Sequence, residues 1–276
     1  MDIRDITERP PMIEDGSGLK RMFDLQKELI NDYVKIEKIP MYPISMNSKP
    51  DQLLIKDFIG RVVEELAEAM ESHLMMIEML NKNELDGIES HLQNFNEELS
   101  DSLHFLLETM IYVNLDYDDV VSYYDVLLTK AKMKDAFWYG GQDPLKTAMA
   151  FAKQVNALKF LTPKLWETSF KVIPDDKVKD EFLRGGRVID PDYHMQMEVM
   201  MWKVVYHLNI SRNFLKNKPW KQSHMVTDST RFHVEIMEAW LAFFNLMDFL
   251  GMTPDSLFLI YFKKNKVNAF RIQSKY

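Results

Sequence analysis

The longest helical pattern in the chain runs from about Asp51 to Asn81. Apolar residues recur along it at the three- and four-residue spacing that marks one face of an α-helix. These residues are Leu54, Ile55, Phe58, Ile59, Val62, Val63 and Leu66. A helix this long with an apolar stripe has to bury that stripe against other secondary structure. Because strand patterns are weak throughout the sequence, we predict an all-α fold, a helical bundle.

Helical patterns continue on both sides of this stretch. We expect helices at about 19–36, 88–114, 116–134, 195–216, 228–250 and 253–266, and no internal repeat. Glycine- and proline-rich breaks are dense between about 135 and 192. We therefore predict a single domain over residues 1–276. Its core comprises 18–134 and 228–276, and an insertion or mobile cap lies at about 135–227.

Composition narrows the classes of function. The formal net charge of −8 argues against nonspecific binding to nucleic acid or to an anionic membrane. The absence of cysteine excludes disulfides, cysteine-based zinc sites and thiol catalysis. The charged N-terminal residues 1–16 lack the apolar core of a signal peptide, and no run of 18 apolar residues is present. We expect a soluble, intracellular protein of the cytoplasm.

Two pairs of acidic residues stand inside the helical patterns. They are Glu65-Leu-Ala-Glu68 and Glu98-Leu-Ser-Asp101. Residues three apart on a helix lie on one face, so two such helices packed together would bring four carboxylates to one point. Carboxylate oxygens are the ligands that Mg²⁺ prefers, commonly together with the phosphates of a substrate. The spacing therefore predicts a site for a hard divalent cation.

The two pairs differ in how strongly they support this prediction. Acidic pairs are common on solvated helix faces, and Glu68 falls opposite the apolar stripe of its helix, so the first pair alone is compatible with a solvent-facing position. The helix of the second pair is apolar on both sides, because Phe105 and Tyr112 lie close in angle to Glu98 and Asp101. Buried carboxylates must be paired, hydrogen-bonded or bound to metal. The second pair therefore carries the prediction.

A di-iron carboxylate bundle is an alternative, because Asp101-Ser-Leu-His104 resembles one half of its ligand pattern. No other histidine of the chain has an acidic residue three positions before it. We therefore interpret His104 as a packing residue or a support for a ligand. Oxygen ligands without histidine or cysteine favour Mg²⁺ or Mn²⁺.

Four motifs, in order along the chain, resemble those of the all-α nucleoside triphosphate pyrophosphatases, which include the dimeric dUTPases, the phage dCTPases and the MazG-like proteins. Met22–Leu29 resembles the N-terminal helix of the dimeric dUTPases, and the two acidic motifs follow it, the second running into His104-Phe105. The segment from Tyr261 to Tyr276 resembles their last motif, although Ile272 and Lys275 stand where the family usually has Gln and Gly. The resemblance covers about residues 18–114 and 230–276, and these departures leave the preferred base open.

The resemblance implies a homodimeric enzyme that uses Mg²⁺ to hydrolyse dUTP to dUMP and pyrophosphate, and it leaves open whether dUDP is also a substrate. It assigns the metal to Glu65, Glu68, Glu98 and Asp101, with Glu65 also accepting a proton from the attacking water. It assigns phosphate binding to Lys264, Asn268 and Arg271, the pyrimidine to Gln26, and closure of the site to Tyr276. Two alternatives stay open. One is a dCTP or broader dNTP pyrophosphatase of the same fold; the other is a non-catalytic helical protein that binds nucleotides or other partners.

Overall fold

The computed structural model describes residues 6–8, 10, 18–82, 84, 86–126, 191–217, 220, 222 and 224–274. These residues form α1 (Gly18–Ile36), α2 (Lys49–Asn81), α3 (Ile88–Tyr112), α8 (Pro191–Phe214), α9 (Ser229–Phe249) and α10 (Pro254–Ser274). A short further helix covers 117–126, and none of the described residues is in a strand. The fold is all-α, as the sequence predicts.

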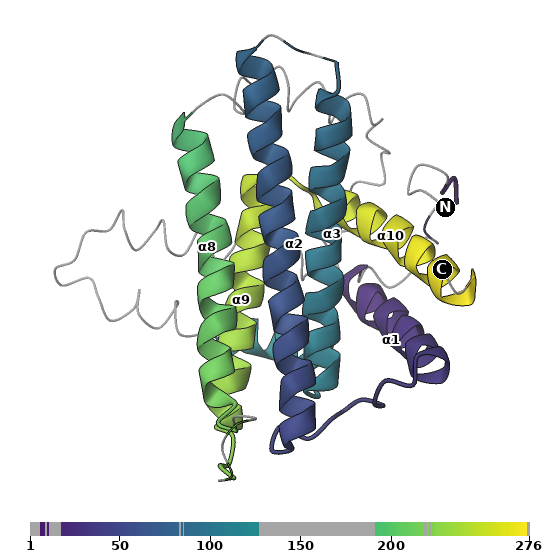
Figure 1. Cartoon of the computed structure of the whole chain (residues 1–276), viewed down its shortest axis with the longest axis vertical. Coiled ribbons are helices and arrows are strands. Elements are labelled where there is room, and N and C mark those ends of the chain that lie inside the picture. The colour runs from purple at the N-terminus through teal and green to yellow at the C-terminus, as the bar shows by residue number, and fades with distance from the viewer. Residues whose placement is uncertain are drawn as a thin grey trace, which may run out of the picture.

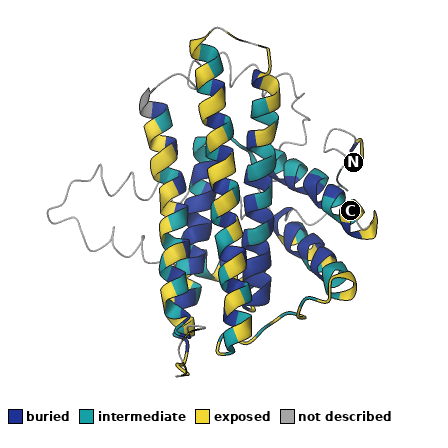
Figure 2. Ribbon diagram, in the orientation of Figure 1, coloured by how far each residue is buried: buried dark blue, intermediate teal, exposed yellow. Residues whose placement is uncertain are grey.

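Four of the helices, α2, α3, α8 and α9, run along the long axis of the molecule, and α1 and α10 lie together against α3 (Figure 1). α2 packs along α3, and α8 packs along α9. The helices turn their buried faces inward and their exposed faces to the outside (Figure 2). In this arrangement α3 lies between α2 on one side and α1 and α10 on the other.

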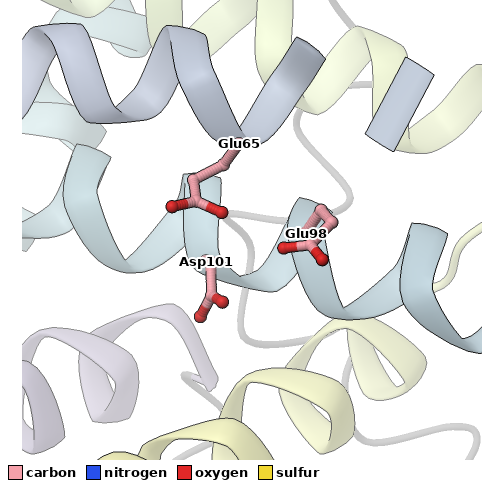
Figure 3. A group of neighbouring side chains, drawn as sticks. All are labelled: Glu65, Glu98 and Asp101. Carbon is pink, nitrogen blue, oxygen red and sulfur yellow. The ribbon is translucent and has the colours of Figure 1, made fainter. Parts of the chain in front are cut away.

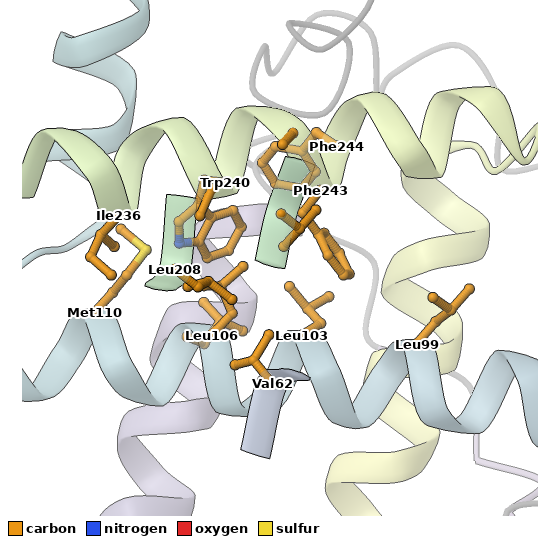
Figure 4. Packing of buried hydrophobic residues seen from close by; sticks show 14 of the residues in the cluster. Val62, Leu99, Leu103, Leu106, Met110, Leu208, Ile236, Trp240, Phe243 and Phe244 are labelled. Atoms are coloured by element: carbon orange, nitrogen blue, oxygen red, sulfur yellow. The ribbon is translucent and has the colours of Figure 1, made fainter. Parts of the chain in front are cut away.

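The centre of the bundle is a continuous apolar core. Val62 of α2, Leu103 of α3, Leu208 of α8 and Trp240 of α9 are fully buried and meet there (Figure 4). Burial of apolar side chains on this scale is the main stabilising contribution to such a bundle. Because α2 and α3 are held by this core over most of their length, the polar residues on their facing edges are also held in place.

The structure contains an internal repeat that the sequence analysis did not detect. Asn114 (φ 61°) ends α3 and Gly251 (φ 76°) ends α9, both in the left-handed conformation. Leu115 N donates to Met110 O at 2.9 Å, and Met252 N donates to Met247 O at 2.9 Å. Met110, Asn114 and Leu115 thus correspond to Met247, Gly251 and Met252. The number of residues between the two members is the same in all three pairs, and we call this number the constant offset.

The helices that follow these two turns begin in the same way. Asp116 N donates to Asp119 Oδ2 at 2.9 Å, and Thr253 N donates to Ser256 Oγ at 2.9 Å. In both cases the reciprocal bond is present, from Asp119 N to Asp116 Oδ1 and from Ser256 N to Thr253 Oγ1. The residues again differ by the same offset. The turn after α3 and the start of the 117–126 helix are therefore repeated by the turn after α9 and the start of α10.

The structure corrects part of the prediction for the middle of the chain. α8 lies inside the range 135–227 that the sequence analysis assigns to an insertion or cap, but it packs along α9 as part of the bundle. Because apolar residues lie on two opposite faces of α8, its sequence does not show the single apolar stripe that is typical of a core helix. The rest of that range up to residue 190 lies outside the described residues. No helix in the described part of the chain is long and apolar enough to cross a membrane.

A buried histidine makes stability depend on pH. His73 of α2 is fully buried, its ring stacks on that of His194 of α8 with centroids 5.2 Å apart, and neither ring nitrogen has a partner among the described residues. Burial, followed by the nearby His194, lowers the pKa of His73 from 6.5 to about 4. A depressed histidine pKa means that the unfolded chain binds the proton first, so stability is lost as the pH falls from about 6.5 towards 4.

We expect the His73→Leu variant to lose less stability over this pH window than the unmodified protein. The difference in the free energy of unfolding between pH 7 and pH 4.5 should shrink by about 2 kcal/mol, because one titrating group is removed. Urea unfolding at the two pH values measures it. An unchanged difference would show that His73 is not held neutral in the fold.

Candidate metal centre

Three carboxylates converge where α2 faces α3. Glu65 extends from α2 towards Glu98 and Asp101 of α3, and one ligand oxygen from each lies within 4.8 Å of the others (Figure 3). All three residues are half-buried. The i,i+3 spacing puts Glu98 and Asp101 on one face of α3, and the packing of Val62 and Leu99 into the core turns that face towards α2.

The electrostatics of this cluster are unfavourable without a counter-charge. Burial, followed by the charge of Asp101 and contact with Glu98, raises the pKa of Glu65 to about 8. Burial also raises the pKa of Glu98 and of Asp101. At neutral pH the cluster therefore retains a proton. A divalent cation can replace that proton, and three carboxylate ligands are the donor set that Mg²⁺ or Mn²⁺ takes.

Lys264 of α10 borders the cluster. Its Nζ lies 2.7 Å from Asp101 Oδ2 and 3.6 Å from Glu97 Oε2, and the residue is only 5% exposed. The positive charge of Lys264 lowers the pKa of Asp101 and so offsets part of the effect of burial. Lys264, which the resemblance assigns to phosphate binding, therefore lies beside the three carboxylates, where its ammonium group can also contact phosphate oxygens.

The other predicted ligands lie around this centre with different exposure. Glu68 is exposed one turn beyond Glu65 on α2 and does not belong to the cluster of three. Asn268 of α10 is half-buried, and Arg271 is exposed but close enough for its charge to lower the pKa of Asp101. Tyr276 lies outside the described residues. The structure thus brings together Glu65, Glu98, Asp101 and Lys264.

The predicted base ligand Gln26 is buried between α1 and α10, at 1% exposure. Its Oε1 accepts a hydrogen bond from the hydroxyl of Tyr261 at 2.8 Å. The ring of Tyr261 stacks on His104 of α3, with centroids 4.2 Å apart. Gln26 is therefore not a surface residue, although the many charged residues of α1 would be compatible with one. It belongs to a buried polar cluster shared by α1, α3 and α10.

Two further members of this cluster have unpaired polar atoms. Asn265 Nδ2 and His104 Nε2 are buried and have no partner within the described structure. His104 Nδ1 lies 2.8 Å from the carbonyl oxygen of Ser100, which can only accept, so Nδ1 carries the proton and Nε2 is an acceptor. Burial lowers the pKa of His104 to about 3, which keeps the ring neutral. A buried donor and a buried acceptor without partners are costly and uncommon in folded proteins.

His104 follows Asp101 by one helical turn, and Asn265 follows Lys264 directly. The polar cluster therefore adjoins the carboxylates along α3 and α10. Sequence reasoning interpreted His104 as a packing or supporting residue and did not assign Asn265. The contact between His104 and Tyr261 joins distant parts of the chain, and no local pattern indicates it.

Comparison of the chain with protein-family models, with curated proteins and with solved structures finds no match. The function of the site has to be inferred from its residues. Three carboxylates beside a buried lysine can bind a divalent cation and an anionic group, such as a phosphate, at the same place.

Proposed function

We propose that the protein hydrolyses a pyrimidine deoxynucleoside triphosphate, with dUTP as the first substrate, to the monophosphate and pyrophosphate. The observation that carries the proposal is the convergence of Glu65, Glu98 and Asp101 beside the buried ammonium of Lys264. The reaction type comes from the resemblance of the motifs to the all-α nucleoside triphosphate pyrophosphatases. dCTP, or a broader range of nucleotides, is the alternative within the same chemistry.

Glu65, Glu98 and Asp101 would hold Mg²⁺, and Glu68 could join them by rotation of its exposed side chain. Bound Mg²⁺ supplies positive charge to the phosphate oxygens and lowers the pKa of a coordinated water. When the cation has replaced the proton that the cluster retains, the carboxylate of Glu65 would also accept a proton from the attacking water. Lys264 and Arg271 would stabilise the negative charge that develops on the phosphates, and Asn268 can donate to them.

The polar cluster would receive the base. A pyrimidine presents a hydrogen-bond donor and an acceptor side by side on its edge. His104 Nε2 and Asn265 Nδ2 offer the complementary acceptor and donor, and the amide nitrogen of Gln26, whose oxygen is bound by Tyr261, offers a further donor. Both uracil and cytosine satisfy such a set, and so do the purines, so the pyrimidine in the proposal comes from the resemblance of the motifs and the base is decided by measurement.

Product analysis tests the proposal. Incubation of dUTP with the protein and Mg²⁺, followed by anion-exchange chromatography, should give dUMP and pyrophosphate in equal amounts. dUDP with inorganic phosphate would contradict the assigned reaction. Saturable binding of dUTP without any product would instead support the non-catalytic nucleotide-binding alternative.

The homodimer that the resemblance implies is also part of the proposal, and α8 offers a surface for it. Met195, Val199, Trp202 and Tyr206 are exposed on α8, Trp202 to 65%, at the alternating four- and three-residue spacing of a coiled-coil seam. Glu198 and Lys203 flank this seam on opposite sides. In a parallel pair of α8 helices the Glu198 flank of one copy faces the Lys203 flank of the other, whereas in an antiparallel pair each flank faces itself.

Because the chain has no cysteine, the Val199→Cys variant tests this pairing directly. In a parallel pair, position 199 meets itself across the twofold axis, so we expect a disulfide-linked dimer on mild oxidation. Light scattering of the unmodified protein should give the mass of two chains, and Trp202→Ala should weaken association about 30-fold. A monomeric mass, or a dimer that does not crosslink at position 199, would contradict parallel pairing through α8.

A further inference from the structure

The repeat extends to the functional site. α9 carries Glu235 and Glu238 at the positions that correspond, by the constant offset described above, to Glu98 and Asp101 of α3. Phe95 and Phe232, one turn before these acidic residues, are identical and both buried. The second half of the bundle therefore holds its own pair of half-buried carboxylates, on the helix that corresponds to α3.

α8 corresponds to α2 in the same way. Ile55, Val62 and Leu66 of α2 are buried, and their counterparts Met197, Val204 and Leu208 of α8 are buried as well, at a second constant offset. By the same offset, the residue of α8 that corresponds to Glu65 is His207. The position that supplies the third carboxylate at the first site therefore supplies an imidazole at the second.

The two acidic residues of α9 have partners within the protein. His207 Nδ1 lies 2.8 Å from Glu235 Oε2. The hydroxyl of Tyr123, from the 117–126 helix, donates to Glu238 Oε1 at 2.6 Å. The 117–126 helix corresponds to α10, which brings Lys264 to Asp101 at the first site. In each unit, then, the third helix carries a hydrogen-bond donor to the second acidic residue, although Tyr123 stands at the position that corresponds to Ile260 and not at that of Lys264.

We propose that α8, α9 and the 117–126 helix form a second, pseudo-equivalent copy of the metal centre, in which His207 and Tyr123 hold the carboxylates in place of a cation. Burial, and then the hydrogen bond to Glu238, raises the pKa of Tyr123, so its hydroxyl remains a donor at neutral pH. Among the described residues, only the first centre gathers three possible ligand groups within 4.8 Å. Because His207 and Tyr123 occupy the carboxylates of the second centre, the chain holds cations at the first centre and not at the second.

The replacement has a consequence for the first site. The contacts of Glu235 and Glu238 join α8, α9 and the 117–126 helix, and α10 follows α9 after a turn of a few residues. The second centre therefore anchors the helix that precedes α10, the carrier of Lys264. Its residues position the active half of the molecule and do not themselves contact the substrate.

Restoring the second centre tests the proposal. In the double variant, His207→Glu supplies a third carboxylate, and Tyr123→Phe removes the hydroxyl that donates a hydrogen bond to Glu238. We expect the full-length double variant to bind about twice as many Mn²⁺ ions per chain as the unmodified protein, measured by electron paramagnetic resonance of unbound Mn²⁺. Adding Glu235→Gln should remove the gain, whereas circular dichroism should confirm that each variant is helical. A folded double variant with an unchanged number of Mn²⁺ ions would overturn the proposal.

A second measurement does not depend on the engineered centre. In the otherwise unmodified chain, Glu235→Gln with Glu238→Gln should leave the number of bound Mn²⁺ ions unchanged, and a decrease would show that the second centre already binds cations. The inference rests on cation binding at the first centre, which Glu98→Gln reports separately. If the unmodified protein binds no Mn²⁺, the proposed function fails; if only the double variant fails to gain ions, the further inference fails.

Discussion

The Glu98→Gln variant is expected to lose at least about 10³-fold in the rate of nucleotide hydrolysis. Glu98 is central to the cluster, because it contacts Glu65 of the facing helix and shares one face of α3 with Asp101. Glutamine keeps the size of the side chain but removes the charge that a divalent cation needs. Steady-state release of pyrophosphate at saturating Mg²⁺ measures the effect.

Stability separates this loss from misfolding. Burial and like charges raise the pKa values of Glu65 and Glu98, so removing one charge should not lower the melting temperature of the cation-free protein. Mg²⁺ should raise the melting temperature of the unmodified protein, because a ligand that binds only the folded state stabilises it, and it should not raise that of the variant. The matched control is Glu64→Gln on the exposed face of α2, which should retain both activity and the response to Mg²⁺. Full activity in Glu98→Gln would refute the metal assignment.

The Lys264→Met variant is expected to lower both stability and turnover. Methionine matches the length of the lysine stem, but it leaves Asp101 without the ammonium that lies 2.7 Å from its carboxylate. Breaking a buried ion pair by removing one partner costs about 3 kcal/mol, and the loss should be largest without a cation. Turnover should fall about 100-fold, because the phosphate oxygens lose a preorganised positive charge. Urea unfolding with and without Mg²⁺, and pyrophosphate release, measure the two effects.

Lys266 provides a control on the same helix. It pairs with Glu8 at 3.2 Å, and both side chains are well exposed to solvent. Exposed ion pairs contribute little, so Lys266→Met should change the free energy of unfolding by less than about 1 kcal/mol and leave turnover intact. Equal effects of the two substitutions would mean that Lys264 acts only through the general charge of α10.

Local sequence patterns were sufficient to predict the helices and to place the second acidic pair on a covered face of its helix, where the structure has it half-buried. The apolar stripe of α2 recurs at helical spacing, and Phe105 and Tyr112 indicate that α3 is covered on two sides. The structure places Tyr112 in the core and Phe105 at half-burial, with Glu98 and Asp101 between α2 and α10. Burial of a helix face is a local property of the sequence, and for that reason it can be predicted without knowledge of the fold.

Long-range properties of the site could not be predicted in this way. The stacking of His104 on Tyr261 joins α3 to α10, and only the folded structure shows that His104 Nε2 is left without a partner. The internal repeat was missed for a related reason. Its two units share burial, turn geometry and helix caps, but few identical residues; Glu98 and Glu235 are one of the identical pairs. Packing conserves the size and polarity of a position more closely than its identity.

The account is tested most directly by pyrophosphate release from dUTP, dCTP, dTTP, dATP, dGTP and UTP, each measured with Mg²⁺ and with excess EDTA. We predict rapid release from a pyrimidine deoxynucleotide, dUTP first, and none in EDTA. A preference for dCTP would keep the metal centre and change the base that the polar cluster of Gln26, His104 and Asn265 binds. No release from any of the six nucleotides, or release that persists in EDTA, would contradict the central claim that Glu65, Glu98 and Asp101 form a cation-dependent hydrolytic site.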